Sequence, residues 1–319
     1  MEPKQNPFSL YDFLGYLIPG FLFIFFFVSI AKDTVCSLFI PDFITNLIQT
    51  ESLYSYLFLT FFCYFFGHVL SYLSSITIEK YSIWTLGYPS CYMLKHKIPG
   101  FWCNFWNKFV SDRASDKKQI QISSFVCRLG YCLMSFLRST VKLIMCTCIL
   151  PVVFTDLIIR KLFMFREFLG KPLDEFLSDK IQMKINRFME DQYSDLDTKI
   201  ESEKSSLSNE PRDPDFFRLI YHFVNEHTTN HYAKMQNYVA LYGFARTMCF
   251  TSIVLFWALL IPAIFTHQLL YSYLWPAIAL FLLSSILYLD FNKFYRRYTL
   301  EALMAFTAIF EAPIVQDHK

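Results

Sequence analysis

Four residues between positions 222 and 231 form the best candidate metal-ligand set in the sequence: His222, Glu226, His227 and His231. Because His227 and His231 are four residues apart, a continuous helix places both on one face, where they can share an ion. Glu226 precedes His227, so the H-E-x-x-H order of zinc proteases is not met, and His222 lies off that face. Two interpretations follow: a metal site carried by His227 and His231, or a solvated polar helix face, which we favour.

A second candidate is a segment in which basic and aromatic side chains alternate. It forms either a juxtamembrane amphipathic helix, with rings at the lipid headgroups and lysines facing anionic lipid, or a pocket. In such a pocket, rings stack on bases while the cations neutralise phosphate. We favour the lipid interpretation for the segment and retain the pocket as a candidate ligand site. Its residues are Lys95, Lys97, Trp102, Trp106, Lys108, Arg113, Lys117 and Lys118.

Signatures of common enzymes are missing from the sequence. It has no Walker loop, no G-x-G-x-x-G, no G-x-S-x-G and no kinase motif set, and its 8 glycines make phosphate-cradling loops hard to build. The 9 cysteines include no C-x-x-C pair, which favours free thiols in a reducing compartment. We therefore expect a protein that is not an enzyme and needs no cofactor.

The elements that must position these residues are membrane helices, because 54% of the chain is hydrophobic and 19% is aromatic. Residues 13–31, 52–78 and 247–289 contain no Asp, Glu, Lys or Arg. About 20 apolar residues cross a bilayer, so the third stretch is long enough for two helices. The sequence thus predicts four spans, at about 13–31, 52–78, 247–265 and 269–289.

The distribution of positive charge predicts the orientation of these spans. Of 29 Lys and Arg residues, 22 lie in residues 79–245 and only Lys32 falls in an outer loop. The predicted fold is an all-α membrane protein, with a mainly helical cytoplasmic domain inserted between spans two and three and both termini cytoplasmic. Its parts are residues 1–78 (spans one and two), 79–245 (the domain, basic over 79–171 and acidic over 172–245), 246–290 (spans three and four) and 291–319 (a cytoplasmic helix).

Three further elements are expected around the spans. Residues 140–159 are apolar but carry Lys142, Pro151 and Asp156, so we expect an interfacial or re-entrant helix, or the core of the inner domain, rather than a fifth span. Apolar residues at helical spacing predict an amphipathic helix over 181–200, and a polar linker follows it. Helix then resumes near Phe216 and is expected to run without interruption into span three.

Inside the predicted spans, candidates for movement are few because no span contains an acid or a base. His68 is the one titratable group there apart from cysteine and tyrosine. It either hydrogen-bonds a neighbouring helix or takes part in gating, and Pro19 and Gly20 offer a kink in span one. With no G-x-x-x-G motif, we expect the spans to pack through large aromatic rings.

The opening residues, PFSLYDFLGYLIPGFLFIFFF, resemble the beginning of small multi-pass membrane effectors from bacterial anti-phage operons, such as the Hailong-type channel effectors. The resemblance covers about 20 residues and the general plan of spans flanking a cytoplasmic domain, and it transfers no functional residue. It implies an inner-membrane oligomer that stays closed until infection and then depolarises the membrane. It also implies a nucleotide-derived signal and a cytoplasmic partner protein.

The sequence leads us to expect a homo-oligomeric pore, closed by a hydrophobic constriction that dewets. Its inner domain is expected to sense an anionic ligand such as a nucleotide, an oligonucleotide or a lipid headgroup. Two alternatives stay open. A membrane-anchored scaffold would bind a partner through the 181–200 helix and the C-terminal helix. A membrane metalloenzyme would use the set of His222, His227 and His231. A transporter fits less well, because the chain has no internal repeat and no charge within its spans.

Overall fold

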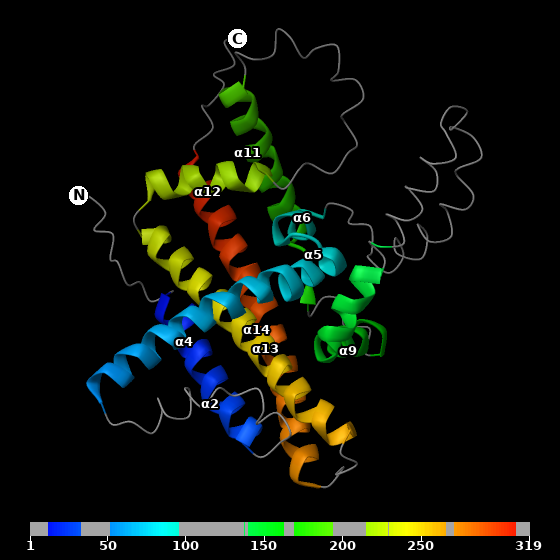
Figure 1. Cartoon of the computed structure of the whole chain (residues 1–319). Coiled ribbons are helices and arrows are strands. Elements are labelled where there is room, and N and C mark those ends of the chain that lie inside the picture. The colour runs from blue at the N-terminus through cyan, green and yellow to red at the C-terminus, as the bar shows by residue number, and fades with distance from the viewer. Residues whose placement is uncertain are drawn as a thin grey trace, which may run out of the picture.

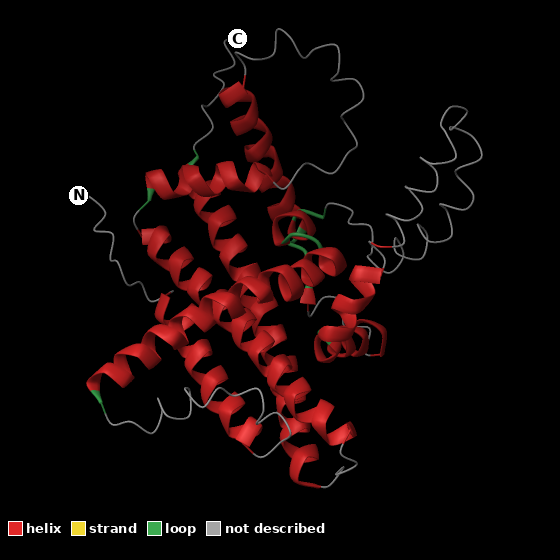
Figure 2. Cartoon of the chain, in the orientation of Figure 1, coloured by secondary structure: helices red, strands yellow, loops and turns green. Residues whose placement is uncertain are grey.

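The structure is a computed structural model in which every regular element of the described residues is a helix, which confirms the all-α prediction (Figure 2). Four of its helices are long and apolar enough to cross a membrane, as predicted: Phe13–Ile30, Leu53–Met93, His231–Ile264 and Tyr273–Ile309. The cytoplasmic placement of the inserted domain stays a prediction. The described residues are 12–32, 52–95, 137, 140–162, 169–193, 215–228, 230–265 and 271–310.

Two long antiparallel helices, α13 (Asn230–Phe265) and α14 (Tyr271–Ile309), form the centre of the molecule (Figure 1). At 1.5 Å per residue they are about 54 and 58 Å long, whereas the hydrocarbon core of a bilayer is about 30 Å thick. Each helix therefore has a part that fits within a membrane and a part that extends beyond it. The stretch 247–289 thus contains parts of two helices, as predicted, and we call α13 and α14 the central hairpin. The second of them continues to Ile309.

The first two spans cross each other beside this hairpin. A short π-helix, η1 (Phe13–Leu17), leads into α2 (Ile18–Lys32), and α4 (Leu53–Ser74) crosses both α2 and the hairpin diagonally (Figure 1). The helix continues through η3 (Ser75–Glu79) and α5 (Lys80–Leu86), beyond the end predicted at residue 78. Gly87 ends it with a φ of 82°, a conformation that favours glycine, and α6 (Pro89–Met93) follows.

The fifth apolar segment is sharply bent. Its two halves, Thr140–Cys148 and Leu150–Arg160, meet at 89°. Pro151 lies in the first turn of the second half, α9 (Leu150–Leu157), and has no amide hydrogen to continue the hydrogen bonds of the first half, which accounts for the bend. Val152 is fully buried and packs with α13 and α14. The segment has the shape of a re-entrant or broken element, the first of which we predicted.

A second hydrophobic core, which we call the distal cluster, surrounds the start of α13 and the end of α14. It is built by α6, α11 (Glu175–Tyr193) and α12 (Asp215–His227) packing against those ends. The predicted amphipathic helix is confirmed by its buried residues, but it begins before residue 181, and residues 194–200 and the linker lie outside the described residues. The buried members of the distal cluster include Ile181, Ile185, Phe188, Ile220, Val224, Met235, Ala302 and Phe306.

The predicted continuous helix from residue 216 into span three is wrong. Helix α12 ends at His227, α13 begins at Asn230, and the two run in different directions (Figure 1). Both the amide and the hydroxyl of Thr228 donate hydrogen bonds to the Val224 carbonyl, at 3.0 and 2.9 Å. These bonds close the last turn of α12. Threonine is a poor helix former, and α12 packs separately in the distal cluster, so the helix does not continue in the direction of α13. The absence of proline between residue 216 and span three was therefore not enough to predict one continuous helix.

Candidate functional site

The break between α12 and α13 separates the histidines that the sequence had placed on one helix face. The Nδ1 atom of His227 lies 2.8 Å from the Phe223 carbonyl, while that of His231 lies 2.8 Å from a carboxylate oxygen of Glu301. His222 is exposed on α12. Within the described residues, no three or more His, Cys, Asp or Glu side chains are grouped to hold a metal ion. The premise that His227 and His231 share one helix is wrong.

Of the candidate ligand-binding residues, only Lys95 lies in the described part of the chain. Its backbone has a positive φ of 59° just after α6, and its ammonium lies 3.5 Å from the exposed carboxylate of Glu175. An exposed pair of this kind contributes little to stability. The remaining candidates lie outside the described residues: Lys97, Trp102, Trp106, Lys108, Arg113, Lys117 and Lys118.

The crossing of the first two spans is a contact of backbone on backbone. A Cβ atom added to Gly67 of α4 would lie 1.9 Å from the Tyr16 carbonyl oxygen, and one added to Gly20 of α2 would lie 1.9 Å from that of Cys63. Close approach through small residues is a common way for membrane helices to associate. The prediction that large rings do all of the packing is therefore wrong at this crossing. The spacing Cys63-x-x-x-Gly67 was the signal that could have shown it.

The candidate gating residues meet at this same crossing. Pro19 and Gly20 are buried near the start of α2. The imidazole of His68 is exposed at the edge of the crossing, where it stacks on Tyr16 at 3.8 Å between ring centroids and meets Tyr64 edge-on at 4.5 Å. These contacts tie the start of the first span to the second. Participation of the three residues in gating stays a prediction.

A buried ion pair joins the second span to the third. Arg246 of α13 has a side chain only 9% exposed, and its guanidinium pairs with the carboxylate of Glu79 at the end of η3. Its Nε atom also donates to the Ser74 hydroxyl at 3.1 Å. The sequence marked Glu79 and Arg246 as the borders of two spans, and the structure brings these borders together. Charge-assisted bonds with little water around them are strong and directional.

A second ion pair lies within the bent segment and is hydrogen-bonded to α5. Asp156 is fully buried, and it pairs with Arg160 and accepts a hydrogen bond of 2.8 Å from the Tyr81 hydroxyl. Arg160 also donates to the Thr85 carbonyl at 3.0 Å. A buried charge is costly unless it is paired and hydrogen-bonded, so these contacts fix the position of the bent segment against α5.

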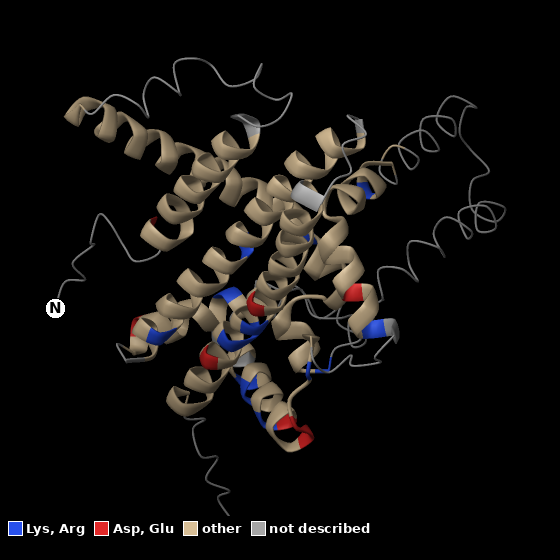
Figure 3. Cartoon of the chain, turned by 90° about the horizontal axis from the view of Figure 1, so that it is seen from below, with Lys and Arg blue, Asp and Glu red and all other residues tan. Residues whose placement is uncertain are grey.

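Two hydroxyl bonds connect the same region to α14. Ser82 donates to the side-chain carbonyl of Asn292 at 2.7 Å, and Thr155 donates to the Ser285 hydroxyl at 2.7 Å. Together these groups form a polar layer, which we call the junction network. It lies between the apolar spans and the distal cluster, where the continuation of the second span, the bent segment, α13 and α14 meet. Figure 3 shows charged residues gathered at this level and beyond it, whereas α4 carries none. The members of the junction network are Glu79, Tyr81, Ser82, Asp156, Arg160, Arg246 and Asn292.

The distal cluster has its own polar anchor on the end of α14. The ammonium of Lys184, from α11, donates to the carbonyls of Thr307 and Phe310 at 2.6 and 2.7 Å. These carbonyls belong to the last turn of α14 and its end, where helix carbonyls lack intrahelical partners. A cation there also interacts favourably with the negative end of the helix dipole. Lys184 thus holds α11 against the extension of span four.

Replacing Lys184 by methionine is expected to destabilise the distal cluster by about 1 kcal/mol, because two charge-assisted bonds are lost while the apolar stem is kept. The melting temperature of the detergent-purified chain should fall by roughly 2–4 °C. Lys180→Met on the exposed side of α11 is the matched control and should leave it unchanged. Equal melting temperatures for the two variants would contradict a capping role for Lys184.

No protein-family model, no curated protein and no solved structure matches the chain. What the protein does must accordingly be inferred from its own residues and contacts. The contacts of greatest interest lie where the apolar spans meet the distal cluster, because charges are buried there and four elements are joined.

Proposed function

We propose that the protein is an effector of the bacterial inner membrane that assembles from several copies into a gated pore and collapses the membrane potential in anti-phage defence. The observation that carries the proposal is that α13 and α14 are unbroken helices shared by two hydrophobic cores. They contribute Ile253 and Tyr288 to the core among the spans, and Met235 and Phe306 to the distal cluster. A shift of the distal cluster therefore moves the same two rods that pack among the spans.

The outer surface of the spans supports assembly from several copies. Large apolar side chains on α4 face outward, among them Tyr54 at 82% exposure and Phe61 at 73%. Such a surface suits either lipid or the helices of a neighbouring copy. Several copies around an axis would enclose a path lined by Phe, Leu and Ile side chains, which closes by excluding water and opens when the helices move apart.

The junction network supports control from the cytoplasmic side. It contains the buried charges Arg246 and Asp156 at the level where α13 and α14 extend beyond the predicted spans. The charge bias of the sequence puts this level at the cytoplasmic face. In this proposal the distal cluster is cytoplasmic and holds the pore closed. The basic segment after α6 binds the anionic trigger, a nucleotide or oligonucleotide, and a cytoplasmic partner protein supplies it.

A potential-sensitive dye in bacterial cells expressing the full chain with its neighbouring genes tests the proposal. The potential should hold before phage infection and collapse during it. Phe188→Ala removes the α11 ring that packs against Phe223, Phe306 and Phe310, so we expect collapse before infection at matched protein abundance in the membrane. Removing a buried phenylalanine ring costs about 3–5 kcal/mol, enough to release the restraint.

Phe176→Ala is the matched control, because this ring lies on the same helix but is 75% exposed. Cells that carry it should behave like cells with the unaltered chain. If the potential stays equal in all strains throughout infection, and purified protein in vesicles passes no ions with ATP, oligoadenylate or phosphatidylglycerol, the pore is contradicted. A scaffold would then be the better interpretation.

A further inference from the structure

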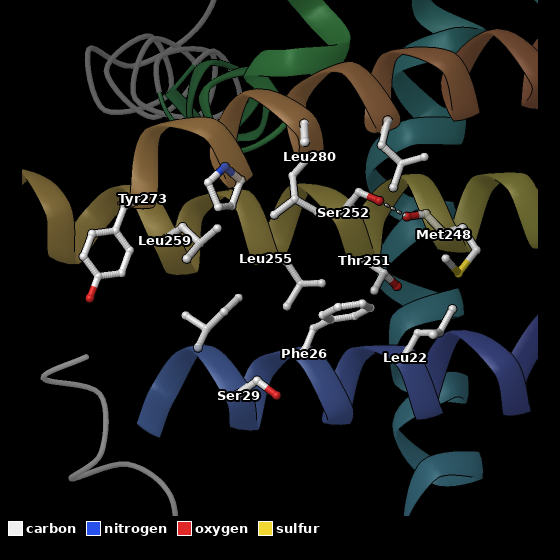
Figure 4. A pocket seen from close by; sticks show the side chains of 14 residues that line it. Leu22, Phe26, Ser29, Met248, Thr251, Ser252, Leu255, Leu259, Tyr273 and Leu280 are labelled. Atoms are coloured by element: carbon white, nitrogen blue, oxygen red, sulfur yellow. Dashed lines mark hydrogen bonds between the residues drawn. The ribbon is translucent and has the colours of Figure 1, made fainter. Parts of the chain in front are cut away.

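An apolar cavity opens between the first span and the central hairpin. Its volume is about 440 Å³, within the range of about 300–1,000 Å³ that is typical of ligand sites. All of its lining residues come from three candidate membrane spans, α2, α13 and α14 (Figure 4). In Figure 4, Leu22 and Phe26 of α2 lie across the cavity from Thr251 and Leu255 of α13.

The serine and threonine hydroxyl groups in the lining donate to carbonyls of their own helices. Ser29 donates to the Phe25 carbonyl at 2.8 Å, Thr251 donates to Thr247 at 2.9 Å, and Ser252 donates to Met248 at 2.9 Å. The last of these bonds is the dashed line in Figure 4. With these three donors occupied, the cavity offers an incoming molecule a surface that is mostly hydrocarbon, with the Tyr273 hydroxyl at one end. Such a surface suits an apolar chain better than a charged molecule.

The length of the cavity matches one leaflet of a bilayer. Along α13 its lining runs from Met248 to Leu259, which at 1.5 Å per residue is about 16 Å, half of the hydrocarbon core of about 30 Å. At the end near the start of α14, the lining includes Tyr273. Tyrosine is enriched where a membrane meets water, so this end suits the headgroup side of a lipid.

We propose that this cavity binds one acyl chain of a phospholipid, taken from the leaflet on the side where α13 ends and α14 begins. The chain lies between α2 and the hairpin and completes the packing that protein atoms leave open there. The inference is independent of the proposed pore, because it rests only on the lining, its depth and its mostly hydrocarbon surface. A lipid in this place would also set the separation of the first span from the hairpin.

Phospholipids with a photoreactive diazirine in the acyl chain provide the test. The unaltered full chain is reconstituted in vesicles of phosphatidylethanolamine and phosphatidylglycerol that contain a small share of the probe, and labelled residues are mapped by mass spectrometry. Leu255 and Leu259 are only 3% and 5% exposed yet line the cavity, so we expect label on both. Leu282, at 55% exposure, should also be labelled, whereas Ile253, at 2% and outside the lining, should not.

A cavity-filling variant gives the second measurement. Ala279→Trp on α14 puts a large ring into the lining and should lower the label on Leu255 at least about fivefold, while label on Leu282 is unchanged. Ile278→Trp, next to it but outside the lining, is the matched control and should leave Leu255 labelled. Absence of label on Leu255 and Leu259 in the unaltered chain would overturn the proposal, and so would equal labelling of Leu255 in both variants.

Discussion

Replacing Gly67 by valine is expected to separate α2 from α4 and to destabilise the protein by at least about 3 kcal/mol, the upper end of what overpacking usually costs. The added Cβ would lie 1.9 Å from the oxygen, 2.5 Å from the carbonyl carbon and 2.9 Å from the Cα of Tyr16. All three are backbone atoms of a helix, so no side chain can rotate away to make room. The two helices must move apart, which also breaks the stacking of His68 on Tyr16.

The melting temperature of the detergent-purified chain measures this effect and should fall by roughly 5–10 °C. Gly20→Val, which meets the Cys63 carbonyl oxygen at 1.9 Å, should behave in the same way. Gly170→Ala is the matched control, because its nearest new contact is a flexible Leu86 methyl at 3.6 Å, an ordinary van der Waals distance. A Gly67→Val protein that melts like the unaltered chain would show that the two backbones are not in contact.

The four spans could be predicted from the sequence because a membrane helix can be recognised from its own residues alone. A segment in hydrocarbon must satisfy its own backbone groups and carry few charges, so length and the absence of charge identify it. The extension of α14 to Ile309 was predictable for a similar reason, since helix-forming residues follow the span without a proline. Burial of Ile181 and Ile185 followed from their spacing on one helix face.

Most of the junction network could not be predicted, because its partners are far apart in the chain. Tyr81 and Asp156 are separated by 75 residues, and Arg246 and Glu79 by 167. Local patterns show that a residue is charged and borders a span, but they do not show which border it meets. The structure buries Arg246 and pairs it with Glu79, a partner that only the folded chain identifies.

The two corrected helix contacts have a related cause. The close crossing at Gly20 and Gly67 depends on the approach of two helices, which a count of 8 glycines in the whole chain does not reveal. The break after His227 depends on the packing of α12 in the distal cluster, in a direction different from that of α13. In both places tertiary contacts decide a geometry that propensity leaves open.

Replacing Asp156 by leucine is expected to destabilise the protein by about 3–5 kcal/mol, the usual cost of removing one partner of a buried ion pair. Asp156 is fully buried, and its carboxylate faces Arg160 and the Tyr81 hydroxyl. Leucine has a similar size, so the loss comes mainly from the uncompensated guanidinium and not from a cavity. Free energies of unfolding measured in mixed detergent would show the change directly.

A double-mutant cycle separates this cause from general damage to the core. If the cost of Asp156→Leu is that of an unpaired Arg160, then Arg160→Met added to it should restore most of the lost stability, since an apolar pair can replace a buried ion pair at little cost. Asp290→Ala is the matched control, because it breaks an exposed pair with Lys293 at 3.5 Å and should cost at most about 1 kcal/mol. A double variant as unstable as Asp156→Leu alone would mean that the shape of the aspartate, and not its charge, holds the bent segment against α5.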